Sequence, residues 1–71
     1  MITVKVIRQS SGDPAEGRKA ALKLANGVTD TKLTDRNGEA HFDNTPANGK
    51  VFVDGSTVQE GYLSGKIVVY I

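Results

Sequence analysis

The chain has 71 residues, with nine basic and eight acidic side chains, a formal net charge of +1 and no cysteine. This length allows one small domain, residues 1–71, and the lack of cysteine excludes disulfides, thiolate metal sites and cysteine nucleophiles. The nearly balanced, scattered charge gives no reason to expect nucleic-acid binding.

The sequence also lacks the features of a membrane or exported protein. No window approaches the roughly 20 apolar residues that span a bilayer. The chain opens directly on strand-like alternation, whereas a signal peptide begins with a basic segment and continues with an apolar one. We therefore expect a cytoplasmic protein with no membrane contact. The alternative is an extracellular domain excised from a longer chain.

Alternating apolar residues predict two strands in the first third of the chain. Ile2, Val4 and Val6 alternate with polar residues, so a first strand should bury its even positions. Residues 14–26 contain good helix formers and also fit a helix. A glycine inside this segment and the alternation of its leucines favour a strand over residues 18–24.

Two Asn-Gly pairs, Asn26-Gly27 and Asn37-Gly38, predict hairpin turns, because both residues of such a pair accept the positive φ that a tight hairpin requires. Residues 28–34 lie between the pairs and form a polar, threonine-rich strand typical of a sheet edge. The second turn should join this strand directly to the next one, at residues 39–42.

The remaining residues predict a loop followed by three more strands. Residues 44–49 are rich in Asn, Pro and Gly and read as the loop, and the strands cover residues 50–54, 56–62 and 66–71. Seven short strands with turn signals every 8–12 residues or so are typical of an antiparallel sandwich. The fold class expected is all-β, a seven-stranded antiparallel Greek-key sandwich of the prealbumin or Ig-like type.

Two segments resemble a known family. They are residues 12–17 (Gly-Asp-Pro-Ala-Glu-Gly) and residues 34–42 (Thr-Asp-Arg-Asn-Gly-Glu-Ala-His-Phe), with an alternating strand between them. Their order looks like the pattern of carboxypeptidase regulatory-like domains, which are prealbumin-like sandwiches. The resemblance covers about residues 2–54 and does not extend over residues 55–71. It implies a folding, adhesion or interaction module, usually without catalysis.

Two similar groups of domains have chemistry that these residues do not match. In Cna-B-type domains a lysine forms an isopeptide bond with an asparagine, but the lysine position falls on Val6 and the last strand has no asparagine. Transthyretin-like hydrolases need several histidines, whereas this chain has only His41. The resemblance therefore implies neither activity, and we expect no enzyme and no cofactor.

One triplet, Glu39, His41 and Asp43, could ligate a metal or act in acid–base catalysis. The three side chains share one face of the strand predicted at residues 39–42, because residues two apart point the same way. A solvated outer face explains the same pattern and is the favoured interpretation. A small metal-dependent or hydrolytic enzyme centred on the triplet is the alternative function. Asp35 and its neighbours also suggest a calcium loop, but a plain turn explains them.

The last predicted strand, residues 66–71, is apolar on both faces. One face of a sandwich strand normally meets water, so the second apolar face calls for a cover. We expect this strand to mediate a homodimer or to bind another protein partner. The alternative is a central strand that is shielded on both sides within the monomer. The predicted interface residues are Phe52, Ile67, Val68, Val69, Tyr70 and Ile71.

Overall fold

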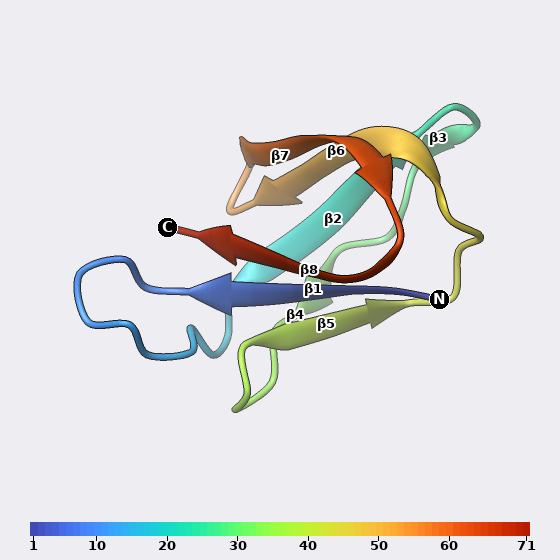
Figure 1. Ribbon diagram of the computed structural model, residues 1–71. Helices are drawn as coiled ribbons and strands as arrows, with labels where there is room; N and C mark the ends of the chain where they lie inside the picture. Colours follow the sequence, from blue (N-terminus) through green and yellow to red (C-terminus); the bar gives the residue numbers. More distant parts are fainter.

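The computed structural model describes residues 1–71 and contains eight strands in two sheets (Figure 1). The strands are β1 (Ile2–Ile7), β2 (Lys19–Leu24), β3 (Gly27–Val28), β4 (Lys32–Leu33), β5 (Glu39–Phe42), β6 (Ala47–Val53), β7 (Ser56–Leu63) and β8 (Gly65–Tyr70). One sheet has the order β5-β1-β8; the other has the order β3-β2-β6-β7, with β4 also on β2. The structure contains no helix, and so none that could span a membrane. The predicted all-β, sandwich-like class is confirmed.

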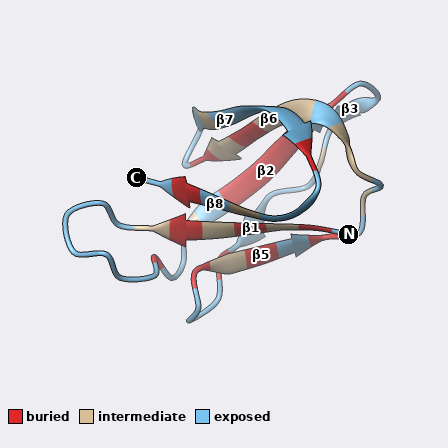
Figure 2. Cartoon of the chain, viewed as in Figure 1, coloured by how far each residue is buried: buried red, intermediate tan, exposed pale blue.

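The core lies between the two sheets and follows the alternation seen in the sequence (Figure 2). The even positions of β1 are fully buried, as predicted, and Phe42 of β5 is the largest fully buried side chain. Leu22 of β2 and Val51 of β6 face them from the other sheet, also fully buried. Residues 19–24 are a strand and not part of a helix, since Ala20, Leu22 and Leu24 all enter this core.

The predicted strand at residues 28–34 is interrupted, which explains why eight strands occur and not seven. Both β3 and β4 pair with β2, but three residues separate Val28 from Lys32 while only two separate their partners, Lys23 and Ala20. The extra residue forms a bulge. Thr29 holds it in place: its Oγ1 accepts a hydrogen bond from the backbone N–H of Leu22 at 2.9 Å.

The Asn37-Gly38 turn does not join two paired strands, contrary to prediction. β4 pairs with β2 in one sheet and β5 pairs antiparallel with β1 in the other, so the turn carries the chain between the sheets. Only Gly38 has a positive φ, of 75°. A Cβ on Gly38 would lie 2.5 Å from the carbonyl oxygen of Val6, so the close approach of β1 also requires glycine.

A two-residue hairpin with positive φ at both positions occurs instead at Asp54-Gly55, between β6 and β7. Asp54 has a φ of 51° and Gly55 a φ of 85°, as a type I′ turn requires. β6 begins at Ala47, so the predicted loop at residues 44–49 is shorter than expected. Gly49 allows this extension, because a Cβ there would lie 2.2 Å from the carbonyl oxygen of Lys23 on β2.

The last strand, β8, lies at an edge and runs parallel to β1. The expected purely antiparallel arrangement is therefore wrong for this pair. β1 and β8 are the first and last strands of the chain, and they lie side by side and run in the same direction (Figure 1). The alternative of a central closing strand shielded on both sides is also wrong, since Val68 and Tyr70 are exposed.

Candidate functional site

The outer face of the three-stranded sheet has a polar end and an apolar end. In its first row, Thr3 of β1 lies between His41 of β5 and Lys66 of β8. In the next row, Lys5 lies between Glu39 and Val68, and beyond it Ile7 pairs with Tyr70. Because side chains alternate along a strand, all these residues point away from the core that their neighbours fill.

The apolar end exposes the side chains of β8. Val68 is 44% exposed and Tyr70 is 60% exposed, whereas Val69 between them is only 2% exposed. Ile71, just after the strand, is 36% exposed, but by the alternation of the strand it falls on the side of Ile67 and Val69 and not on the outer face. The structure thus leaves an apolar outer surface on the last strand, at the positions where the sequence suggested one.

The other residues of the predicted interface lie elsewhere. Val69 is in the core, and Ile67 is half-buried against it. Phe52 belongs to β6 in the other sheet, where it pairs with Ala21 on the outer face. Since the two outer faces of a sandwich point in opposite directions, Phe52 does not share a surface with Val68 and Tyr70.

The backbone of β8 also has a free side. Ile71 directs both of its backbone groups toward β1, because its N–H donates to Ile7 and its C=O accepts from Gln9, each at 2.9 Å. These directions alternate along a strand, so Lys66, Val68 and Tyr70 direct their N–H and C=O groups away from β1. No other strand pairs with β8. This edge is therefore open to another strand.

The polar end brings together Asp35, Glu39 and His41, whose potential ligand atoms all lie within 4.8 Å of one another. The Nε2 atom of His41 lies 3.7 Å from Oε1 of Glu39 and 4.0 Å from Oδ2 of Asp35. Asp43, the third member of the predicted triplet, is not in this cluster. β5 ends at Phe42, whereas the turn before β5 brings Asp35 back toward its first residues.

Asp35 is fixed by its own turn. Its Oδ1 accepts hydrogen bonds from the backbone N–H groups of Asn37 at 2.9 Å and Glu39 at 3.0 Å. The bond from Glu39 is the main cause that holds the pKa of Asp35 below its usual value, and the bond from Asn37 and the nearby charges of His41 and Lys5 act in the same direction. Sequence reasoning treated Asp35 as a turn residue and missed its position beside His41.

The family-like segment at residues 34–42 is explained by structural roles. Thr34 is buried, donates through Oγ1 to the carbonyl oxygen of Ala15 and accepts from the N–H of Arg18 at 2.9 Å. Asp35 and Gly38 shape the turn, and Ala40 and Phe42 fill the core.

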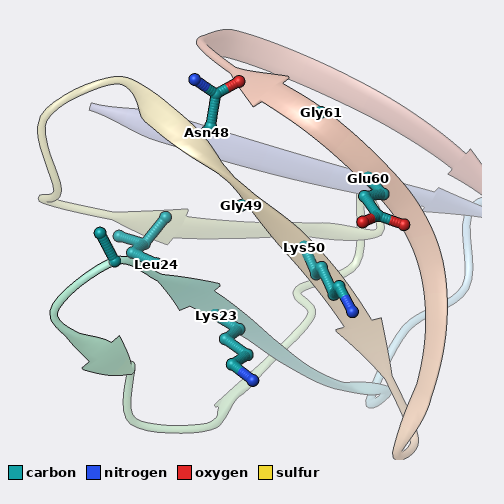
Figure 3. Close-up of a pocket in the computed structure, with 8 residues that line it drawn as sticks. Lys23, Leu24, Asn48, Gly49, Lys50, Glu60 and Gly61 are labelled. Atoms are coloured by element: carbon teal, nitrogen blue, oxygen red, sulfur yellow. The ribbon is translucent and has the colours of Figure 1, made fainter.

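A groove on the five-stranded sheet is a second surface feature lined by charged side chains. Lys23 of β2 and Lys50 of β6 are direct cross-strand neighbours, and Glu60 of β7 is the next residue in the row. Figure 3 shows the two lysine side chains extending in a similar direction from adjacent strands, with Glu60 beside them. No ion pair joins the three side chains. The groove therefore has charge but no converging set of ligands.

Comparison with known proteins adds no assignment to this geometry. No family model matches the sequence, and no curated protein matches it.

Proposed function

We propose that this protein is a non-enzymatic β-sandwich interaction module that self-associates through β8. The observation that supports this proposal is the combination, on one edge strand, of unpaired backbone groups with the exposed apolar side chains of Val68 and Tyr70. An edge strand with free backbone groups is a template for pairing with another chain.

The pairing partner proposed is a second copy of the same strand. A symmetric antiparallel pair centred on Val68 puts Val68 opposite its own copy, and Lys66 opposite Tyr70 of the partner subunit. All three residues direct their backbone groups to the free side, so the pair forms without a change in the monomer. The two Val68 side chains then meet on the outer face, and Tyr70 lies beside Lys66 of the partner subunit.

The charge on this edge is compatible with pairing. Lysine on an edge strand normally discourages association, because its ammonium group would be desolvated. In this chain the Nζ of Lys66 lies 2.9 Å from Oε2 of Glu39 on the same face. Its charge thus has a partner within the monomer. Because one strand per subunit forms the contact, we expect a weak dimer that depends on concentration.

The finer fold assignment, a Greek-key sandwich of the prealbumin or carboxypeptidase regulatory-like type, is part of the proposal. It is supported by the family-like segments at residues 12–17 and 34–42. It is also supported by the strand count, which becomes seven when β3 and β4 are taken as one bulged strand on β2. Domains of this type usually serve as interaction modules, which agrees with the proposed role.

The enzyme alternative has less support. None of the surface hollows is lined by Asp35, Glu39 or His41, so no substrate cavity adjoins the cluster. Asp43, which the alternative requires, is outside it.

The proposal is tested by light scattering after size exclusion, at several protein concentrations. The unmodified chain should shift toward dimer mass as concentration rises, and the double variant Val68→Asp/Tyr70→Ser should stay monomeric. The matched control is Val28→Asp/Tyr62→Ser, which makes the same changes at similarly exposed positions, 62% and 66%, of the other sheet. Circular dichroism checks that each variant is folded.

The control should dimerise like the unmodified chain. A chain that is monomeric at every concentration contradicts the proposal. Equal loss of dimer in both double variants would also contradict it, since the contact would then not belong to β8.

A further inference from the structure

We infer that Asp35, Glu39 and His41 form a binding site for a divalent transition-metal ion, with Zn²⁺ the ion best suited to it. This inference is independent of the proposed self-association. It concerns the polar end of the outer face, whereas self-association concerns the apolar end and the free edge of β8.

One atom of each side chain is free to bind. These atoms are Oδ2 of Asp35, Oε1 of Glu39 and Nε2 of His41. Nε2 lies 3.7 Å from Oε1 and 4.0 Å from Oδ2. Ligand atoms about 2.0–2.1 Å from a tetrahedral Zn²⁺ are about 3.4 Å from one another. The side chains of Asp35 and His41 are 47% and 50% exposed, so small rotations can close this difference.

The remaining polar atom of each side chain is held by a group other than the three side chains. Oδ1 of Asp35 accepts from the backbone N–H groups of the turn, and Oε2 of Glu39 lies 2.9 Å from the Lys66 ammonium. Nδ1 of His41 lies 2.9 Å from Oγ1 of Thr3 on β1. Such outer contacts orient metal ligands and select the histidine tautomer. Here they leave one atom of each side chain free, and the potential ligand atoms lie within 4.8 Å of one another.

The histidine contact suits metal binding. When Nδ1–H donates to Oγ1 of Thr3, Nε2 has a lone pair available and no proton. Metal binding selects this tautomer, since an imidazole must be neutral to act as a ligand.

The set of donor atoms indicates the class of metal. One imidazole nitrogen and two carboxylate oxygens suit Zn²⁺ and related ions, whereas Ca²⁺ and Mg²⁺ prefer ligand sets made only of oxygen. Three protein ligands leave a position for water. Lys66 offsets part of the negative charge of Glu39 and so limits the affinity.

The test uses the full chain, Zn²⁺ alone and two readouts. Titration calorimetry gives the affinity, and long-range ¹H–¹⁵N spectra of the single histidine identify the nitrogen that binds. The unmodified chain should bind one Zn²⁺ through Nε2. Asp35→Asn should weaken binding about tenfold or more, while Asn keeps the Oδ1 acceptor that the turn needs.

Asp43→Asn is the matched control, because Asp43 is an exposed carboxylate just after β5 but outside the cluster. It should change the affinity less than about twofold, and His41→Ala should abolish binding. The inference is overturned if the histidine resonances do not respond to Zn²⁺. It is also overturned if Nδ1 is the nitrogen that binds, or if the two aspartate variants weaken binding equally.

Discussion

The edge formed by β8 differs from the two edges of the five-stranded sheet. On one side of that sheet, β3 and β4 are two residues each and are separated by the bulge at residues 29–31. On the other side, β7 is mostly polar, with Tyr62 as its exposed large apolar side chain, and has a bulge opposite Val51 and Phe52. β8 has six residues, pairs with β1 without interruption and exposes Val68 and Tyr70.

This difference separates protected edges from an open one. Short strands, bulges and polar side chains are the devices by which proteins prevent edge-to-edge association. The five-stranded sheet has them on both sides, whereas β8 has only Lys66, whose ammonium group is paired with Glu39. The contrast within one molecule supports the assignment of the contact to β8.

The largest effect expected comes from placing proline at neighbouring positions of β8. Val69 is buried and directs its N–H toward β1, so Val69→Pro should lower the free energy of unfolding by about 3 kcal/mol. Val68 directs its N–H to the free side, so Val68→Pro should cost far less while preventing dimer formation. Urea denaturation and light scattering measure the two effects. Similar losses of stability would show that the backbone directions are assigned wrongly.

A smaller effect is expected at the bulge between β3 and β4. Thr29→Val removes the acceptor for the backbone N–H of Leu22 and should lower the free energy of unfolding by about 1 kcal/mol. Thr31→Val is the matched control, because the Thr31 hydroxyl makes no hydrogen bond, and it should change stability little. Urea denaturation compares them. Equal effects would mean that the Thr29 hydroxyl does not stabilise the bulge.

The smallest effect is expected at the turn between β6 and β7. The backbone N–H of Lys19 donates a hydrogen bond to Asp54, and this bond is the main cause that holds the pKa of Asp54 below its usual value of 3.8. The ion pair with Arg18 lowers the pKa further. A carboxylate with a lowered folded-state pKa stabilises the fold above the unfolded-state pKa, and this contribution disappears as the pH falls through the folded-state pKa.

Asp54→Asn should therefore lower the urea midpoint slightly at neutral pH and leave it unchanged in strong acid. Asparagine also tolerates the positive φ at this position, so the substitution tests the charge and not the backbone. Asp30→Asn is the control, because its carboxylate accepts no hydrogen bond. A difference between Asp54→Asn and the unmodified chain that persists in strong acid would contradict the role of the charge.

The sequence predicted the features of the fold that depend on residues close together in the chain. Alternation gave the buried faces of β1, β2, β5 and β6, and the apolar character of residues 66–71 predicted the exposed surface of β8. It did not give the pairing of β8 with β1 in parallel, because pairing between the two ends of the chain leaves no local signal.

Two errors have a common physical reason. Asn37-Gly38 and Asp54-Gly55 look alike in sequence, but only the second joins adjacent strands of one sheet, and only it has positive φ at both residues. Similarly, Glu39, His41 and Asp43 share a face by period two, yet Asp35 reaches the cluster through the turn. The alternation of side chains predicts which residues of a single strand share a face. It does not predict which residues a turn brings beside that strand.

The most direct test of self-association through β8 is amide hydrogen exchange at Val68 as a function of protein concentration. The Val69 amide bonds to β1 and should exchange slowly at every concentration. The Val68 amide should exchange quickly in dilute solution and slowly in concentrated solution, because a second β8 then accepts its hydrogen bond. Fast exchange at Val68 at every concentration would contradict strand pairing at this edge.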